Sequence, residues 1–229
     1  MTEVTPAILV RDWKTLKEEL AIYVNVSKLI QIDICDGKFV PSTSWPMHLE
    51  DKKNVVKILN EEEGMPFWDR VDFEFDLMVS NAHEQIDFFI GLGAKQLVFH
   101  LEAEGDINEF KEFLEGLDLY IRENIKIGLA INTTTSVDLL KPLISYIDYI
   151  QCMGIEKIGF QGQNFDEKVL SQIEKIHREY PEMEISVDGS VNKNTAEGLV
   201  RAGATRLVIG SALKENPDII GNIKYFENL

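Results

Sequence analysis

Three aspartates stand at the ends of short segments whose composition predicts β-strands. Asp33 lies within Q-I-D-I-C-D-G-K-F-V-P, Asp76 within D-F-E-F-D-L-M-V and Asp188 within S-V-D-G-S-V. Carboxylates that converge in a fold transfer protons, hold a cation, or do both. One strand-end aspartate often only caps the following turn, but three of them together with Gln31 favour a functional site.

Glycines follow three consecutive predicted strands in the last third of the chain. The residues concerned are Gly159, Gly162 and Gln163, then Gly189 and Ser190, and finally Gly210 and Ser211. Glycine lets backbone N–H groups approach an anion closely, and the loops after the last two strands of parallel barrels often hold a phosphate. The pattern predicts phosphate binding at residues 189, 190, 210 and 211, with the loop 159–163 closing over it.

Apolar runs of strand length alternate with amphipathic stretches of helix length along the whole chain. The strands are expected at 5–9, 29–34, 72–79, 96–99, 125–131, 147–152, 184–187 and 206–209. The main helices are expected from 12, over 55–59, from 81, and over 107–117, 137–146, 166–180, 194–202 and 217–226. This alternation predicts an α/β fold with parallel strands, a single (β/α)8 TIM barrel over residues 1–229; an open doubly wound sheet is the alternative.

Local signals mark the ends of several helices. Asp12 is expected to cap the first helix, and Asn81 with Glu84 three residues later forms a capping pattern before the third. Pro142 lacks a backbone donor, so the helix over 137–146 is expected to begin late or to bend.

Strand parity determines which side chains share a face, because alternate residues of a strand point to opposite sides. The residues expected on one shared face are Gln31, Asp33 and Cys35 on the second strand and Glu74, Asp76 and Met78 on the third. The residues between them are apolar and suit the interface with the helices. The polar set is therefore expected to point into the barrel, with the aspartates at the carboxyl ends, where such barrels carry their reactive groups.

Composition restricts the partners and the compartment. Lys and Arg total 23 against 39 for Asp and Glu, a net charge of −16, which disfavours nucleic acid and anionic membranes. Cys35 and Cys152 do not make a disulfide framework, and no apolar stretch approaches membrane-spanning length. We expect a cytoplasmic protein without a signal peptide.

A series of segments, in order and spacing, resembles the ribulose-phosphate 3-epimerase family of phosphate-binding barrels. The segments are P-A-I-L, D-I-C-D-G-K-F-V-P, D-L-M-V, G-A-K-Q-L-V-F-H-L-E-A, G-L-A-I-N, G-F-Q-G-Q-N-F, V-D-G-S-V, A-G-A and G-S-A. The resemblance implies an isomerase that inverts carbon 3 of a ketopentose phosphate such as ribulose 5-phosphate. It also suggests a homo-oligomer and places Met78 and His100 at the substrate pocket, although His100 alternatively has a structural, hydrogen-bonded role.

The resemblance implies that Asp33 and Asp188 are the two proton-transferring acids. The two histidines that hold the family's metal fall on Gln31 and Asp76, so both are replaced here.

Other positions also depart from the family pattern. Ala7 replaces a serine that faces the substrate, and Cys35 replaces a methionine. Glu156 and Lys157, with an additional Ile158, replace an asparagine and a proline.

Two states of this site are possible, one with a bound cation and one without. Gln31, Asp33, Asp76 and Asp188 offer only oxygen ligands, which suit Mg²⁺ or Mn²⁺ better than Zn²⁺. Without a cation, two carboxylates about 4 Å apart repel by about 4 kcal/mol at an effective dielectric near 20. One would then stay protonated, and a neutral Asp76 would donate a hydrogen bond.

Three function classes follow from these features. The first is a sugar-phosphate epimerase or isomerase, because both proton-transferring acids are present. The second is a sugar-phosphate lyase of the related decarboxylase barrels, which use an Asp-x-Lys-x-x-Asp array; D-F-E-F-D-L lacks the lysine. The third is a non-catalytic barrel that binds a phosphate ligand, which Ala7, Gln31 and Asp76 favour.

Overall fold

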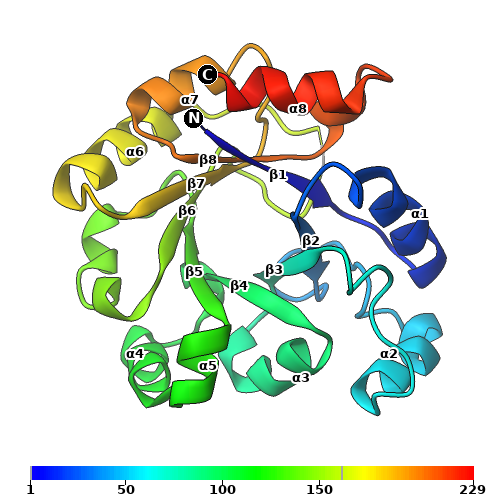
Figure 1. Cartoon of the computed structure of the whole chain (residues 1–229). Helices are drawn as coiled ribbons and strands as arrows, with labels where there is room; N and C mark the ends of the chain where they lie inside the picture. The colour runs from blue at the N-terminus through cyan, green and yellow to red at the C-terminus, as the bar shows by residue number, and fades with distance from the viewer. Residues whose placement is uncertain (1, 161) are drawn as a thin grey trace. The chain divides into compact units, whose positions relative to one another are not determined.

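The computed structural model describes residues 2–160 and 162–229 (Figure 1). Eight strands close into a barrel in sequence order, and the paired strands run parallel, which confirms the predicted (β/α)8 fold. The strands are β1 (Glu3–Ile8), β2 (Leu29–Cys35), β3 (Asp72–Met78), β4 (Ala94–His100), β5 (Lys126–Ile131), β6 (Tyr149–Met153), β7 (Glu184–Asp188) and β8 (Arg206–Ile209).

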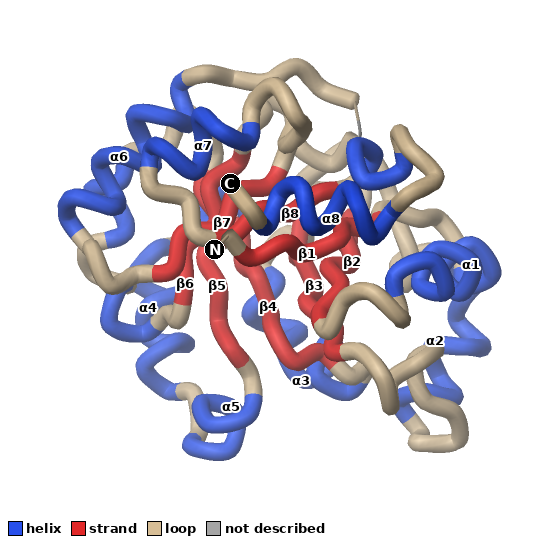
Figure 2. Tube along the Cα trace, turned by 45° about the horizontal axis from the view of Figure 1, so that its top comes forward, coloured by secondary structure: helices blue, strands red, loops and turns tan. Residues whose placement is uncertain are grey.

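Helices, blue in Figure 2, alternate with the strands, drawn in red. Several strands are first followed by a short 3-10 turn, and β5 is followed only by two such turns. The α-helices of the described residues are α1 (Trp13–Tyr23), α2 (Lys52–Leu59), α3 (Ile86–Gly91), α4 (Ile107–Gly116), α5 (Leu119–Asn124), α6 (Lys168–Glu179), α7 (Ala196–Ala202) and α8 (Ile219–Glu227). The 3-10 turns are η1 (Leu49–Asp51), η2 (Ala82–Gln85), η3 (Leu101–Ala103), η4 (Val137–Leu140), η5 (Ile144–Tyr146) and η6 (Ser211–Lys214). Among the described residues, no helix combines the length and the apolar character needed to cross a bilayer.

The prediction of a helix over 137–146 is wrong. That stretch forms the two 3-10 turns η4 and η5, with Pro142 between them, because proline removes the donor that a continuous helix would need. Helix α5 was not expected; Asp118 caps it by accepting a hydrogen bond from the Ile121 N–H at 2.9 Å.

The predicted side-chain cap at Asp12 is confirmed, whereas the one predicted at Asn81 is wrong. The Asp12 carboxylate accepts from the Thr15 N–H at 2.9 Å. Asn81 adopts a left-handed backbone with φ of 48°, and its side chain makes no cap hydrogen bond. Its side-chain oxygen accepts instead from the Gly105 N–H at 3.1 Å, so Asn81 links two loops.

The chain packs as two compact units, one of Ala7–Lys126 and one of Met1–Pro6 with Ile127–Leu229. In the first, the apolar members of β2 and β3, such as Ile32 and Phe75, are fully buried, as expected for a strand covered by helices. In the second, the two chain ends lie close together (Figure 1), and Thr2 donates its N–H to the Glu227 carbonyl at 3.3 Å. The single domain over residues 1–229 stays a prediction.

Candidate active site

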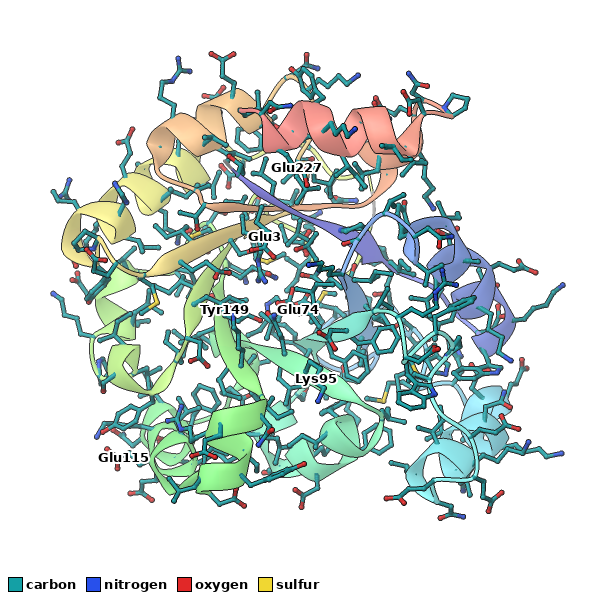
Figure 3. The ribbon with its side chains drawn as sticks, in the orientation of Figure 1. Glu3, Glu74, Lys95, Glu115, Tyr149 and Glu227 are labelled. Atoms are coloured by element: carbon teal, nitrogen blue, oxygen red, sulfur yellow. The ribbon has the colours of Figure 1, made fainter. Side chains whose placement is uncertain are left out.

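The neighbouring strands β2 and β3 hold their polar residues side by side. Asp33 is in register with Asp76, and Gln31 is in register with Glu74. Residues in register on parallel neighbours share a face, so the structure confirms the parity expected for this pair of strands. Glu74, labelled in Figure 3, leaves β3 on the side opposite to α3. Gln31, Glu74 and Asp76 are fully buried, and Asp33 is half-buried.

Each of the two strand-end acids has a hydrogen-bonding neighbour. The Gln31 side-chain N–H donates to Asp33 Oδ1 at 2.8 Å. His100 Nε2, at the end of β4, lies 3.0 Å from Asp76 Oδ1, and both side chains are fully buried. The His100 ring also packs against Phe39 with 5.7 Å between ring centroids. Gln31 therefore orients Asp33, and His100 orients Asp76.

The pairing of His100 with Asp76 was not predicted from the sequence. Asp76 is in register with Val98, and His100 is two residues further along β4, so all three share one face. Strand parity applied to β4 would have found this contact. An imidazole thus lies beside Asp76, but it comes from the neighbouring strand.

The predicted convergence of the three acids is present. Asp33, Asp76 and Asp188 each offer one carboxylate oxygen, and these oxygens lie within 4.8 Å of one another. A set of carboxylate oxygens fits a hard divalent cation such as Mg²⁺ or Mn²⁺. Gln31 turns its amide nitrogen toward Asp33, so its part as a ligand stays a prediction.

A short loop after β2 fixes the backbone around Asp33. The Ser44 hydroxyl donates to the Asp33 carbonyl at 2.7 Å and accepts from the Cys35 N–H at 2.9 Å. The Asp36 carboxylate accepts from the Phe39 N–H at 2.9 Å and from the Ser80 N–H at 2.9 Å. Neither Ser44 nor Asp36 was singled out in the sequence, although both lie in or beside the D-G-K-F-V-P segment.

Cys35 is a buried thiol next to the acids. Burial raises the pKa of Cys35 to about 12, and the nearby Asp33 carboxylate acts in the same direction. Only the thiolate is a strong nucleophile, so the fully buried Cys35 fits a small core residue better than a nucleophile.

The end of β7 is shaped by glycines. The Gly154 N–H, just after β6, donates to the Asp188 carbonyl at 2.6 Å. A Cβ at Gly154 would overlap the Gly189 carbonyl oxygen, so only glycine permits this approach. Gly189 and Ser190 have φ of 104° and 54°, so the chain turns sharply after Asp188.

The loop after β6 contacts the turn after β7. The Ser190 hydroxyl donates to the Gln163 carbonyl, and the side chains of Asn192 and Thr195 donate to the Ser190 carbonyl, each at 2.8 Å. Gly159 and Gly162 both have positive φ. The structure thus brings Gln163 to Ser190. Closure of the loop 159–163 over a phosphate stays a prediction, and Gln161 lies outside the described residues.

The last pair of predicted phosphate ligands lies in the same compact unit as that loop. Gly210 follows β8 directly, and Ser211 begins η6, which ends at Lys214. Phosphate binding at Gly189, Ser190, Gly210 and Ser211 stays a prediction. Met78, in register with Cys35, is buried. Its contact with a substrate also stays a prediction.

Comparison with known proteins gives one consistent family. The model of the ribulose-phosphate 3 epimerase family matches residues 3–214. The ribulose-phosphate 3-epimerase of Eremothecium gossypii is 30% identical over 227 residues, covering 96% of this chain and 91% of that protein. The Bacillus subtilis protein of the same name is 29% identical over 225 residues, covering 95% and 94%.

Solved structures with a similar fold have other names. KGPDC from Streptococcus mutans superposes with a TM-score of 0.69 at 12% identity, covering 99% of this chain and 96% of that chain. The 3-hexulose-6-phosphate synthase of Salmonella typhimurium has a TM-score of 0.67 at 12% identity, covering 100% and 97%. At such identities the likeness shows the barrel fold alone.

Proposed function

The chain belongs to the ribulose-phosphate 3-epimerase family, and we propose that it interconverts ribulose 5-phosphate and xylulose 5-phosphate, or a closely related pair of ketopentose phosphates. The grouping of the carboxylates of Asp33, Asp76 and Asp188 carries this proposal. Epimerisation needs a base on one face of the carbon and an acid on the other, and carboxylates from different strands supply both.

Asp33 and Asp188 act as the acid and base pair. One removes the proton on carbon 3, which leaves an enediolate, and the other returns a proton to the opposite face. Gln31 keeps the Asp33 carboxylate in one orientation through the 2.8 Å hydrogen bond. A carboxylate held in this way is ready to accept the proton without rotating first.

Asp76 and His100 form the supporting pair. Their hydrogen bond, between two fully buried side chains, fixes the Asp76 carboxylate beside Asp33. If a hard divalent cation binds, Asp33, Asp76 and Asp188 would hold it, and it would stabilise the negative charge of the enediolate. If none binds, the hydrogen bond with His100 still holds the Asp76 carboxylate in place.

The phosphate group is bound at the turns after β6, β7 and β8. This part of the proposal is supported by the positive φ of Gly189 and by the contact of Ser190 with Gln163. Such turns present backbone N–H groups to an anion, and the chain's charge of −16 makes a local site necessary. The homo-oligomeric state and the cytoplasmic location stay predictions.

The test is conversion of ribulose 5-phosphate to xylulose 5-phosphate by the purified protein, without added metal and with Mg²⁺, Mn²⁺ or Zn²⁺. We expect turnover that falls by about 10²-fold or more in Asp33→Asn and in Asp188→Asn. Asp138→Asn is the control, because Asp138 is exposed and pairs with Lys141 and Lys175. A folded protein that converts no ketopentose phosphate under any of these conditions would favour the non-catalytic alternative.

A further inference from the structure

A cavity of about 540 Å³ lies at the amino ends of β3 and β4, the strands whose carboxyl ends carry Asp76 and His100. Residues at the start of β3 and β4, including Asp72 and Lys95, line it, together with the segment between α2 and β3. Cavities of this volume accommodate a drug-sized molecule. The proposed epimerase mechanism does not use this cavity.

The wall of the cavity is a segment held by its own backbone hydrogen bonds. The Glu62 N–H donates to the Lys57 carbonyl at 2.8 Å, and the Trp68 N–H donates to the Met65 carbonyl at 3.2 Å. The Val71 N–H donates to the Phe67 carbonyl at 3.1 Å. Met65 is buried, so it anchors the middle of the segment. The cavity is therefore largely formed before any ligand arrives.

The floor is apolar, and an aromatic side chain stands at the wall. Met65, Val71, Phe73 and Leu92 are all buried and line the cavity. Trp68 also lines it, yet this residue is 68% exposed. Its indole lies against Gly64, where a Cβ would stand 2.5 Å from Cδ1. A tryptophan left in water beside an apolar floor offers a ring face to a ligand.

Acidic side chains dominate the charge around the cavity. Glu61, Glu62, Glu63 and Asp72 line it, against the single lysine Lys95 among the described lining residues, which Figure 3 labels on β4. Glu63 is already paired with Lys57, and Asn60 donates to Glu62 at 3.3 Å. Glu61 and Asp72 therefore add to the negative field of a chain that carries −16 overall. This field repels phosphates and carboxylates and favours a cation.

We propose that this cavity binds a small amphipathic organic cation, an ammonium group attached to an apolar or aromatic body. The cationic head is attracted by the Trp68 ring face and by the carboxylates of Glu61 and Asp72. The apolar body covers the floor of Met65 and Phe73. This ligand class is distinct from the anionic sugar phosphate of the active site.

The probe for the test is benzyltrimethylammonium, titrated into the full-length protein by calorimetry. Benzyl alcohol serves as the neutral counterpart and phenylacetate as the anionic one. We expect saturable binding of the cation, at least about tenfold weaker binding of the alcohol, and no detectable binding of the acid.

Variants assign the binding to this cavity. Trp68→Leu and the double variant Glu61→Gln/Asp72→Asn should each weaken binding of the cation about fivefold or more. Lys95→Met should tighten it, because it removes the opposing positive charge. Glu84→Gln is the matched control, since Glu84 is an exposed acid on η2 outside the cavity. This variant should bind the cation with the affinity of the wild type. These exposed positions leave the core intact, and the thermal midpoint of each variant checks this.

Four results would overturn the proposal. They are the absence of saturable binding to the wild-type protein, equal binding of all three probes, cation binding that Trp68→Leu leaves unchanged, and weaker binding by Lys95→Met. Sedimentation adds another outcome: self-association of the wild type that Trp68→Leu abolishes would assign the face to a second copy of the chain instead. The ribulose 5-phosphate assay is run on the same samples and tests the proposed function independently of cation binding. Trp68→Leu should retain full turnover, because Trp68 lies outside the proposed active site.

Discussion

At the scale of single residues, the site has Asp33 and Asp188, the two acids that the family resemblance implies. The positions where the family resemblance implies metal-binding histidines carry Gln31 and Asp76, yet His100 reaches Asp76 from the next strand. Gln31 in turn donates to Asp33 rather than standing apart from it. Gln31 and Asp76 therefore each make a hydrogen bond within the site, and this favours a rebuilt site over a decayed one.

His100 is predicted to be a positioning residue for Asp76. His100→Phe removes the hydrogen bond while keeping a ring, and we expect turnover to fall about 10- to 100-fold, with KM changed much less. His100→Gln keeps a donor and should recover part of the loss. Steady-state kinetics of both variants measure the effect, with the exposed His177→Gln as the control.

A purely structural role for His100 would give a different pattern. The Phe and Gln variants would then differ only in thermal midpoint, and each folded variant would keep the kcat of the wild type.

Cys35 is predicted to be unreactive although it lies beside the acids. With a pKa near 12, its thiolate fraction at pH 8 is about one in 10⁴, and this fraction grows only as the pH rises toward 12. Burial also raises the pKa of Cys152 to about 12. Iodoacetamide at pH 8 should label neither cysteine in the native protein and both in urea, as read by mass spectrometry. Rapid labelling of native Cys35 would contradict this environment.

At the scale of elements, the ends of β6 and β7 must approach closely for Asp188 to be placed. The Gly154 N–H bonds the Asp188 carbonyl, and the missing Cβ leaves room for the Gly189 carbonyl. The sequence could not single out Gly154 among the chain's glycines. Glycine is needed there because of a close contact with the end of another strand, which the local sequence does not encode.

Gly154→Ala should therefore damage the site through the backbone. The added Cβ forces the two strand ends apart, and we expect a cost of about 1–3 kcal/mol in stability. The value of kcat/KM should fall much more than the stability explains, because Asp188 moves with the strand end. Gly116→Ala is the matched control, because its added Cβ would meet no other part of the protein within 4 Å outside the backbone of its own helix and its chain neighbours. Wild-type kinetics for Gly154→Ala would refute this role.

Helices were predicted less well than strands for a physical reason. The buried strands alternate with polar stretches strongly enough to be found, and the cap at Asp12 is a local signal. By contrast, Asn81 bonds Gly105 in another loop, a long-range contact that local pattern does not encode. The 137–146 stretch has the periodicity of a helix, but Pro142 decides its structure.

At the scale of the whole molecule, the count and order of the strands determined the fold correctly. Eight alternating units predict a closed parallel barrel, and the strand order confirms it. The acids could be located because parity and the carboxyl-end rule act together. Ser44 could not be located in this way, because it reaches Asp33 from a loop outside the strands, whereas His100 needed parity to be applied to β4 as well.

The proposed function requires this chain to move the proton on carbon 3 of a ketopentose phosphate with Asp33 and Asp188. The most direct measurement is solvent exchange: ribulose 5-phosphate is incubated with the protein in D₂O, with and without Mg²⁺ or Mn²⁺, and analysed by mass spectrometry. We predict that one deuterium enters at carbon 3 in substrate and product, and that Asp33→Asn and Asp188→Asn each abolish this exchange. If the folded wild-type protein incorporates no deuterium into any ketopentose or ketohexose phosphate under these conditions, the proposed function is contradicted and the barrel is a non-catalytic binder.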